Sequence, residues 1–192
     1  MKYILWILIF LSLQGCSIKE SSMKVYTLDG NTDFKAYSNR FKNKIIKVSY
    51  PQSLKEKMSQ NMQFSYSDLE QGSYQNSEWS NNLGQLLQGI FIQTLQQSGL
   101  FKGVTSYTSI MQEDYRLEST VFDFSHRVRG SASHAFVTVQ FSLIETDSGK
   151  MVKSKLFNYA VPTTTTDANG YVNATNIAIS RLNRDLIAWL EF

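Results

Sequence analysis

Cys16 is the residue whose type and position point most directly to a covalent chemistry. It is the only cysteine in the 192 residues, and it follows an unbroken apolar run over residues 3–11 that Lys2 precedes. One cation, a short apolar run and a small residue before a cleavage point are the layout of a secretory signal peptide. A lone cysteine in an exported chain has no disulfide partner within that chain, so its sulfur is available for alkylation.

The residues before Cys16 give this chemistry a definite form. Leu13-Gln14-Gly15-Cys16 resembles the bacterial lipobox, Leu-x-Gly-Cys, in which the cysteine sulfur receives a diacylglyceryl group before the chain is cut on its N-terminal side. The resemblance implies that residues 1–15 are a lipoprotein signal peptide. It also implies that Cys16 is the first residue of the mature chain and its lipid attachment site, carrying palmitate-type acyl chains. The alternative is a cysteine that stands by chance at the end of an ordinary signal peptide.

The membrane anchor that this implies is a lipid. The apolar run is shorter than the about 20 residues that a membrane span needs, whereas two or three acyl chains contribute about 0.8 kcal/mol for each buried CH2 group. Ser17 stands where Asp would signal inner-membrane retention in enteric bacteria, so the resemblance favours the periplasmic face of the outer membrane, within the cell envelope. Residues 16–23 then form a lipidated tether, and residues 24–192 a single domain.

The bulk composition excludes one class of partner and favours a sheet-rich domain. The formal net charge is +3, and the Lys and Arg residues are dispersed, so the sequence does not indicate nucleic acid as a partner. Aromatic residues make up 13% of the chain and only two residues are proline, which favours a folded, sheet-rich domain over disorder.

Hydrophobic periodicity predicts strands separated by one long helix and closed by another. Period-two alternation predicts strands over residues 24–28, 44–49, 62–66, 104–109, 115–124, 135–143 and 151–161, a short strand leading to Trp79, and a helical turn within residues 54–60. A 3.6-residue period predicts a helix over residues 80–98 and another that begins between Ala168 and Ala174 and runs nearly to the end. The predicted fold class is α+β, a mostly antiparallel sheet with two main helices on one face.

The first of these helices has recognisable ends and two internal glycines. Ser80 or Asn81 is expected to cap its start, and Gly99 to take the left-handed conformation at its end. Gly84 and Gly89 each lower helix propensity by about 1 kcal/mol relative to Ala. Close approach of the helix to the sheet would account for both.

The polar segment around the two histidines is the other candidate site. His126 and His134 flank residues 127–133, which we predict to be a solvated hairpin loop. The functional alternative is that His126, Arg127 and Arg129 contact lipid phosphates or an acidic patch of a partner, at about 1 kcal/mol per cation near a membrane.

Other residue patterns predict no catalytic residue, no cofactor and no metal site. The two histidines lack further ligands at a known metal spacing, and no Gly-x-Ser-x-Gly nucleophile motif or GxxxxGK phosphate loop occurs. The carboxylates of Asp114, Glu118 and Asp123 have no predicted partner for acid–base work, and we expect Asp114 and Glu118 to face solvent.

A set of spaced residues follows the lipobox along almost the whole mature chain: Tyr26-Thr27-Leu28, Pro51, Phe64 to Tyr66, Trp79, Gly99-Leu100-Phe101, Tyr115-Arg116-Leu117, Phe122-Asp123-Phe124, Phe157 and Trp189-Leu190. In these residues and in the order of its elements, the chain resembles the ABC-type transport auxiliary lipoprotein family, also described as PqiC-like. One departure is that Ser80-Asn81-Asn82 stands where the family usually has a proline before the helix.

The resemblance implies a fold similar to the N-terminal domain of TolB and a non-catalytic role in an ABC/MCE-type lipid transport system that links the inner and outer membranes. The expected partners are an MCE-domain protein of the transporter, the membrane through the acyl chains on Cys16, and further copies of the chain in a homo-oligomeric ring. Two alternatives remain open: an outer-membrane assembly lipoprotein that partners a β-barrel or a secretin, and a lipid-modifying enzyme.

Overall fold

The computed structural model of the protein describes residues 22–30, 34–53, 58–67 and 69–192. The predicted signal peptide and Cys16 therefore lie outside the described residues, as do residues 54–57 of the predicted helical turn. The described chain forms one sheet and two helices, in the order β1 (Lys24–Tyr26), β2 (Ile45–Val48), β3 (Asn61–Ser65), β4 (Gly72–Trp79), α2 (Leu83–Ser98), β5 (Gly103–Ser106), β6 (Tyr115–Arg129), β7 (Ala132–Glu145), β8 (Lys150–Pro162) and α3 (Ala168–Glu191).

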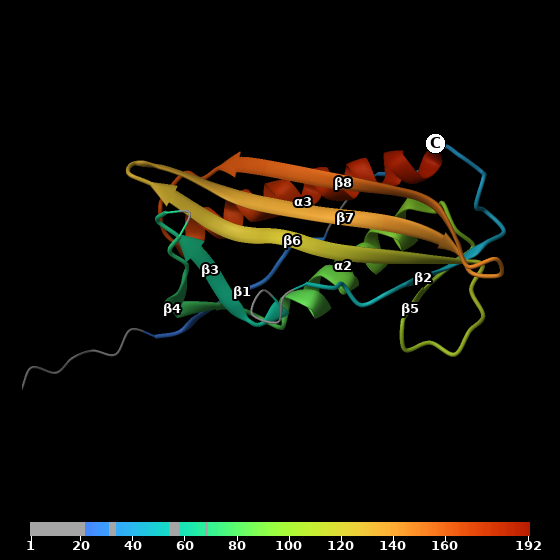
Figure 1. Cartoon of the computed structure of the whole chain (residues 1–192), viewed down its shortest axis with the longest axis horizontal. Helices are drawn as coiled ribbons and strands as arrows, with labels where there is room; N and C mark the ends of the chain where they lie inside the picture. Colours follow the sequence, from blue (N-terminus) through green and yellow to red (C-terminus); the bar gives the residue numbers. More distant parts are fainter. Residues whose placement is uncertain (1–21, 31–33, 54–57, 68) are drawn as a thin grey trace, which may run out of the picture.

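Strand β6 is the centre of the eight-stranded sheet. One of its edges pairs with β7 in antiparallel register along the whole strand, and β7 pairs in turn with β8. Its other edge is shared between two parallel neighbours, β2 beside its first residues and β3 beside its last. Beyond these, β5 extends β2, and β4 and β1 extend β3. The long strands β6, β7 and β8 therefore support two small groups of short strands at different points of one edge (Figure 1).

The sheet is mixed, so the prediction of a mostly antiparallel sheet is wrong. Four of its strand pairs are parallel: β1 with β4, β2 with β5, β2 with β6, and β3 with β6. Alternation of apolar and polar residues is the same in both chain directions, so it indicates which side chains face the core but not which way a strand runs. The connections from β6 to β7 and from β7 to β8 are tight turns, and tight turns impose antiparallel pairing.

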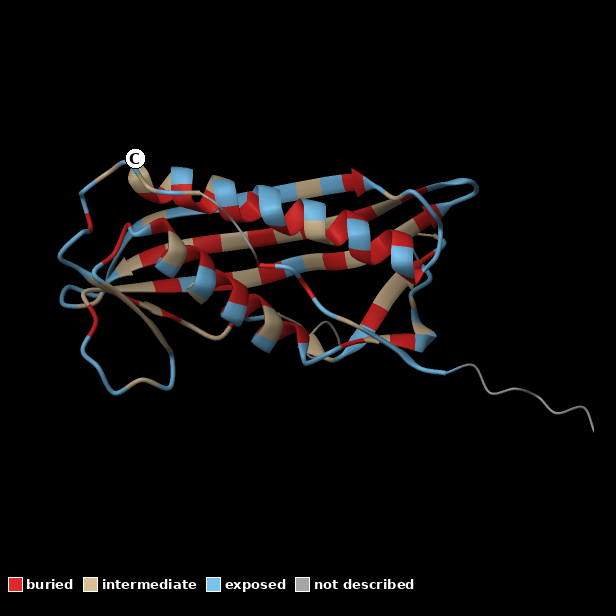
Figure 2. Ribbon diagram, turned by 180° about the vertical axis from the view of Figure 1, so that it is seen from behind, coloured by how far each residue is buried: buried red, intermediate tan, exposed pale blue. Residues whose placement is uncertain are grey.

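Both helices lie on one face of the sheet, as the sequence predicted (Figure 2). In β7 the alternate residues from Ser133 to Leu143 are buried beneath the helices, and those between them are half-buried on the open face. The predicted C-terminal helix is confirmed as α3, and its residues Tyr171, Ala178, Leu182 and Leu186 are fully buried against the sheet. Asp167 caps α3, since its carboxylate accepts a hydrogen bond of 2.9 Å from the Gly170 amide.

The boundaries of α2 differ from the prediction at the start and agree at the end. The helix begins at Leu83, with Asn82 in the N-cap position, so neither Ser80 nor Asn81 is its cap. The Asn81 side chain instead accepts a hydrogen bond from the Asn82 amide at 2.8 Å, which orders the chain just before the first turn. Gly99 has a φ of 69° and ends the helix in the left-handed conformation.

The two glycines of α2 have different surroundings. A Cβ atom on Gly84 would lie 2.3 Å from the hydroxyl oxygen of Tyr50, which comes just after β2 in the chain. The absence of a side chain at Gly84 therefore leaves room for the tyrosine ring. A Cβ atom on Gly89 would meet no described atom within 4 Å. Close packing therefore explains Gly84 but not Gly89. The expectation that both glycines allow close approach of the helix to the sheet is wrong.

We expect Gly89→Ala to stabilise the protein by about 1 kcal/mol, because alanine gains helix propensity at an exposed position without meeting a neighbour. The measurement is the free energy of unfolding in urea. Gly84→Ala is the matched control: the same change in the same helix forces the Tyr50 ring to move and should be neutral or destabilising. Equal stabilisation by both substitutions would contradict the packing described for Gly84.

Candidate functional site

The segment around Arg127 and Arg129 is the end of a strand. Strand β6 continues to Arg129, and the chain reverses at Gly130, which has a φ of 60°. The predicted loop over residues 127–133 is therefore wrong except for this turn. Strand alternation places His126 and Val128 under the helices and the two arginines on the open face.

His126 belongs to the core. Its side chain has no exposed surface, its Nδ1 lies 2.7 Å from the Tyr74 hydroxyl, and its ring stacks on that of Tyr171 at a centroid distance of 5.1 Å. Burial lowers the pKa of His126 to about 4, although the Asp167 carboxylate opposes this in part. The imidazole is therefore neutral at pH 7 and has no access to a membrane or partner, so the structure rules out the alternative of a contact through His126.

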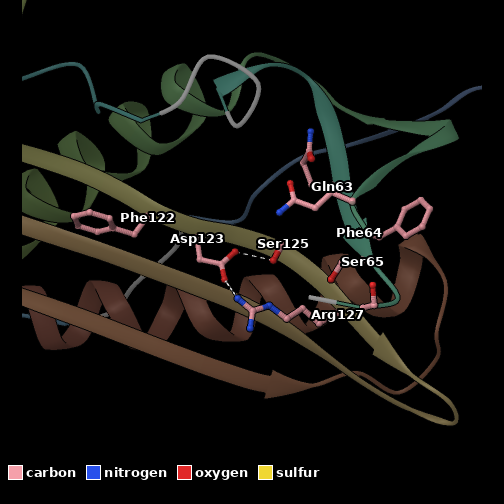
Figure 3. Close-up of a pocket in the computed structure, with 9 residues that line it drawn as sticks. Gln63, Phe64, Ser65, Phe122, Asp123, Ser125 and Arg127 are labelled. Carbon is pink, nitrogen blue, oxygen red and sulfur yellow. Dashed lines mark hydrogen bonds and ion pairs between the residues drawn. The ribbon is translucent and has the colours of Figure 1, made fainter. Parts of the chain in front are cut away.

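A cavity opens on the exposed face where β6 lacks a neighbouring strand. A β-bulge at Phe122 shifts the register, so that Val121 faces Val139 but Asp123 faces Thr138. Since β3 pairs only with His126 and Arg127, the edge of β6 between the bulge and His126 borders a space of about 320 Å³ (Figure 3). The residues that line this β3–β6 cavity are Gln63, Phe64, Ser65, Ser67, Gln71, Phe122, Asp123, Ser125 and Arg127.

A charged pair forms part of the wall of the β3–β6 cavity. The Arg127 guanidinium binds the Asp123 carboxylate in an ion pair, and the Ser125 hydroxyl donates a hydrogen bond of 2.7 Å to Asp123 Oδ1 (Figure 3). The guanidinium carbon also lies 4.1 Å from the centre of the Phe136 ring on β7, a cation–π contact. These contacts fix the direction of the arginine side chain, although 41% of its surface remains exposed.

Arg129 is held differently from Arg127. Its guanidinium donates hydrogen bonds to the backbone carbonyls of Ser65, at 3.3 Å, and Val128, at 3.1 Å. It therefore ties the end of β3 to the end of β6. The structure brings Arg127 into the lining of the β3–β6 cavity, whereas Arg129 is not one of the lining residues. The contact of either arginine with a membrane or a partner stays a prediction.

The carboxylates at the start of β6 stabilise the sheet. The Asp114 carboxylate accepts hydrogen bonds of 2.8 Å from the Lys44 ammonium and the Ile45 amide, so it is not simply solvated as predicted. Burial would raise the pKa of Glu113, but hydrogen bonds from Lys47 and Arg116 outweigh burial and lower the pKa to about 2.

Glu118 is exposed, as expected. Among the described residues no group of three His, Cys, Asp or Glu side chains could hold a metal ion.

The spacing of residues in the sequence contains an unused signal for the Asp123–Arg127 pair. Residues 123, 125 and 127 have the same parity, so in a continuous strand they share a face. A long arginine side chain can then lean back along the strand over a small serine. Polar residues are frequent in this part of the sequence, so a loop was predicted where the strand in fact continues.

The chain belongs to the family of ABC-type transport auxiliary lipoprotein components, whose model matches residues 26–187. The match begins at the last residue of β1, spans every later described strand and ends within the last turns of α3, so the resemblance to this family is confirmed. The family is one of lipid-anchored envelope proteins that accompany ABC-type transporters as auxiliary components.

No curated protein sequence matches this chain. Within the described residues, neither helix is long and apolar enough to cross a membrane.

Solved structures confirm the fold at low sequence identity. A crystal structure of a Xanthomonas campestris protein of the DUF330 family is 18% identical, has a TM-score of 0.79, and covers 88% of this chain and 95% of its own. A hypothetical protein from Chlamydia trachomatis is 9% identical, with a TM-score of 0.53 and coverage of 78% and 96%. The PelC dodecamer from Paraburkholderia phytofirmans is 14% identical, with a TM-score of 0.50 and coverage of 79% and 92%.

Proposed function

We propose that this chain is a non-catalytic, acyl-anchored auxiliary component of an MCE-type ABC lipid transporter, held at the periplasmic face of the outer membrane. The observation that carries the proposal is the family match, which begins at residue 26, only ten residues after the lipobox cysteine. The lipid on Cys16 anchors the chain to the membrane, and the folded domain provides a surface that an MCE-domain partner can bind. The ATPase of the transporter supplies the energy.

The position of the first described residues indicates how the anchored domain is oriented. In Figure 1 the chain enters β1 at the lower left, at the same end of the long axis as the turn between β6 and β7. The connection from β5 to β6 lies at the lower right, away from that entry. Because β6 has 15 residues, it alone spans about 50 Å at 3.3 Å per residue. An anchor at the left therefore leaves the right-hand end free to meet a partner in the periplasm.

The connection from β5 to β6 has the character of a protein contact. Tyr107, Ile110 and Met111 are all exposed there, and Ile110 is fully exposed. The Ser109 side chain accepts a hydrogen bond from the Met111 amide at 3.2 Å, so the segment is an ordered turn that presents its apolar side chains to solvent. We assign the MCE-domain partner to this apolar turn, because it lies away from the anchored end and its side chains gain burial on binding.

The double substitution Ile110→Glu/Met111→Glu is expected to reduce recovery of the MCE-domain protein by at least about tenfold, since buried apolar anchors dominate interface energies. The measurement is a detergent pull-down of the acylated chain from its own envelope, quantified by mass spectrometry. Met151→Glu/Leu156→Glu, on the exposed strand β8, is the matched control and should leave recovery unchanged. An equal loss in both variants would argue against the apolar turn as the contact.

The same pull-down tests the function itself. Recovery of an MCE-domain protein with its permease and ATPase supports the transport role. Recovery of a β-barrel or a secretin alone would replace it with the alternative, an outer-membrane assembly lipoprotein. We also propose a homo-oligomeric ring, which is consistent with the similar fold of the PelC dodecamer. The mass of the detergent-solubilised protein tests the ring independently of any partner.

A further inference from the structure

We infer that the β3–β6 cavity binds a zwitterionic phosphoamine headgroup, the chemistry of phosphatidylethanolamine, with the phosphate on Arg127 and the ammonium on Asp123. The Arg127–Asp123 pair presents a cation and an anion side by side on the cavity wall. A ligand that carries its own adjacent anion and cation can lie antiparallel to such a pair, so that each charge meets its opposite. A ligand with a phosphate alone would meet Asp123 unfavourably.

The remaining lining supplies the neutral hydrogen-bonding groups that a phosphate ester needs. Gln63 and Gln71, which carry side-chain amides, and Ser65 and Ser67, which carry hydroxyls, are among the residues that line the same cavity. A guanidinium has five N–H donors in a planar fork that matches phosphate geometry, and Asp123 occupies the Nη2 side of that fork. The contact between Arg127 and Phe136 holds the fork in place before a ligand arrives.

The size and surroundings of the cavity favour a headgroup with its lipid tail outside. A volume of about 320 Å³ lies at the lower end of the range of small-molecule sites, which is about 300–1,000 Å³. Phe122 is the bulged residue of β6 and is 54% exposed at the border of the cavity. Its ring gives the first carbons of a glycerol ester or acyl chain an apolar surface outside the polar pocket (Figure 3).

The choice of a lipid rather than a soluble phosphoamine rests on the acyl anchor proposed above. Strand order places β1 three strands from β6, or about 15 Å at roughly 4.8 Å per strand. Cys16 precedes Lys24 by eight residues, a reach of at most about 28 Å. The headgroups of the anchoring membrane are therefore within reach of the cavity.

The test is titration calorimetry of the full acylated chain in non-ionic detergent with dihexanoyl phosphatidylethanolamine, dihexanoyl phosphatidylglycerol and O-phosphoethanolamine. We expect preference for phosphatidylethanolamine over phosphatidylglycerol. Arg127→Gln should weaken both lipids by about tenfold or more, and Asp123→Asn should weaken only phosphatidylethanolamine, which removes the preference. Arg184→Gln is the matched control, since Arg184 pairs with Asp185 on α3, on the helix-covered side, and it should change nothing.

Three results would overturn the inference. The first is equal binding of the two lipids by the unaltered protein, and the second is unchanged lipid binding by the Arg127→Gln variant. The third is binding of O-phosphoethanolamine as tightly as phosphatidylethanolamine, which would make the ligand a soluble phosphoamine instead of a lipid. If the charge variants melt at a lower temperature, Gln71→Trp serves in their place. It fills the cavity from an exposed position without altering the ion pair and should abolish binding. Lipid binding without recovery of an MCE-domain protein would reject the transport role and keep the site.

Discussion

Cys16→Ser is expected to move the protein from the membrane fraction to the soluble fraction and to abolish labelling with radioactive palmitate. The reason is quantitative: each buried CH2 group of an acyl chain contributes about 0.8 kcal/mol, so two or three chains make dissociation negligible, whereas serine does not accept the diacylglyceryl group. Fractionation of envelopes after high-salt washing measures the effect, because salt removes proteins held by charge alone.

A second substitution separates anchorage from its destination. Ser17→Asp keeps the acylated cysteine, so the protein should remain with membranes but, in an enteric host, appear in the inner-membrane fraction. A Cys16→Ser protein that stays with washed membranes would mean that another segment or a partner holds it there. In that case the lipid would not be the anchor that we propose.

Acid is expected to destabilise the domain through His126 before most carboxylates titrate. Burial lowers the pKa of His126 from 6.5 to about 4, so between these values the unfolded chain binds a proton that the folded chain excludes. The stability that the neutral imidazole provides is complete above pH 6.5 and is lost progressively as the pH falls from 6.5 to about 4. At about 1.4 kcal/mol per pH unit, the loss between pH 6.5 and pH 5 is about 2 kcal/mol.

Urea unfolding of the soluble Cys16→Ser protein at pH 7.5, 6 and 5 measures this slope. His126→Phe should remove it while keeping a flat ring beside Tyr171. Tyr74→Phe is the control: it deletes the hydroxyl at Nδ1 but leaves the imidazole buried, so the slope should persist. If His126→Phe retains the full loss between pH 6.5 and pH 5, other groups cause the acid sensitivity.

The elements of this fold were largely readable from the sequence, whereas their arrangement was not. The helix-covered face of β7 follows directly from its strict alternation, and the left-handed end of α2 follows from Gly99. Strand direction could not be read, because alternation is the same in both directions and the contacts between β2, β3 and β6 join distant parts of the chain. The sheet was therefore predicted with the wrong pairing.

The candidate site was less predictable than the fold because it depends on two local exceptions to the pattern. His126 is polar by type but buried, so the inward series Phe124, His126 and Val128 did not appear as a strand. The bulge at Phe122 shifts the β6–β7 register, and alternation alone gives no sign of a bulge. Arg127 was identified as a candidate, but its partner Asp123 was read as isolated. The anchor, by contrast, was predicted from contiguous residues alone.

The sharing of β6 between two groups of short strands has a consequence for the order of folding. The strand pair of β2 and β5, and the group of β1, β4 and β3, meet in the sheet only through β6. Strands β6, β7 and β8 are joined by tight turns and need only neighbouring segments to pair. Local contacts form faster than distant ones, so we expect the C-terminal half to fold first. The N-terminal half would then dock onto it, which keeps the segment nearest the lipid extended until the last strands have crossed the inner membrane.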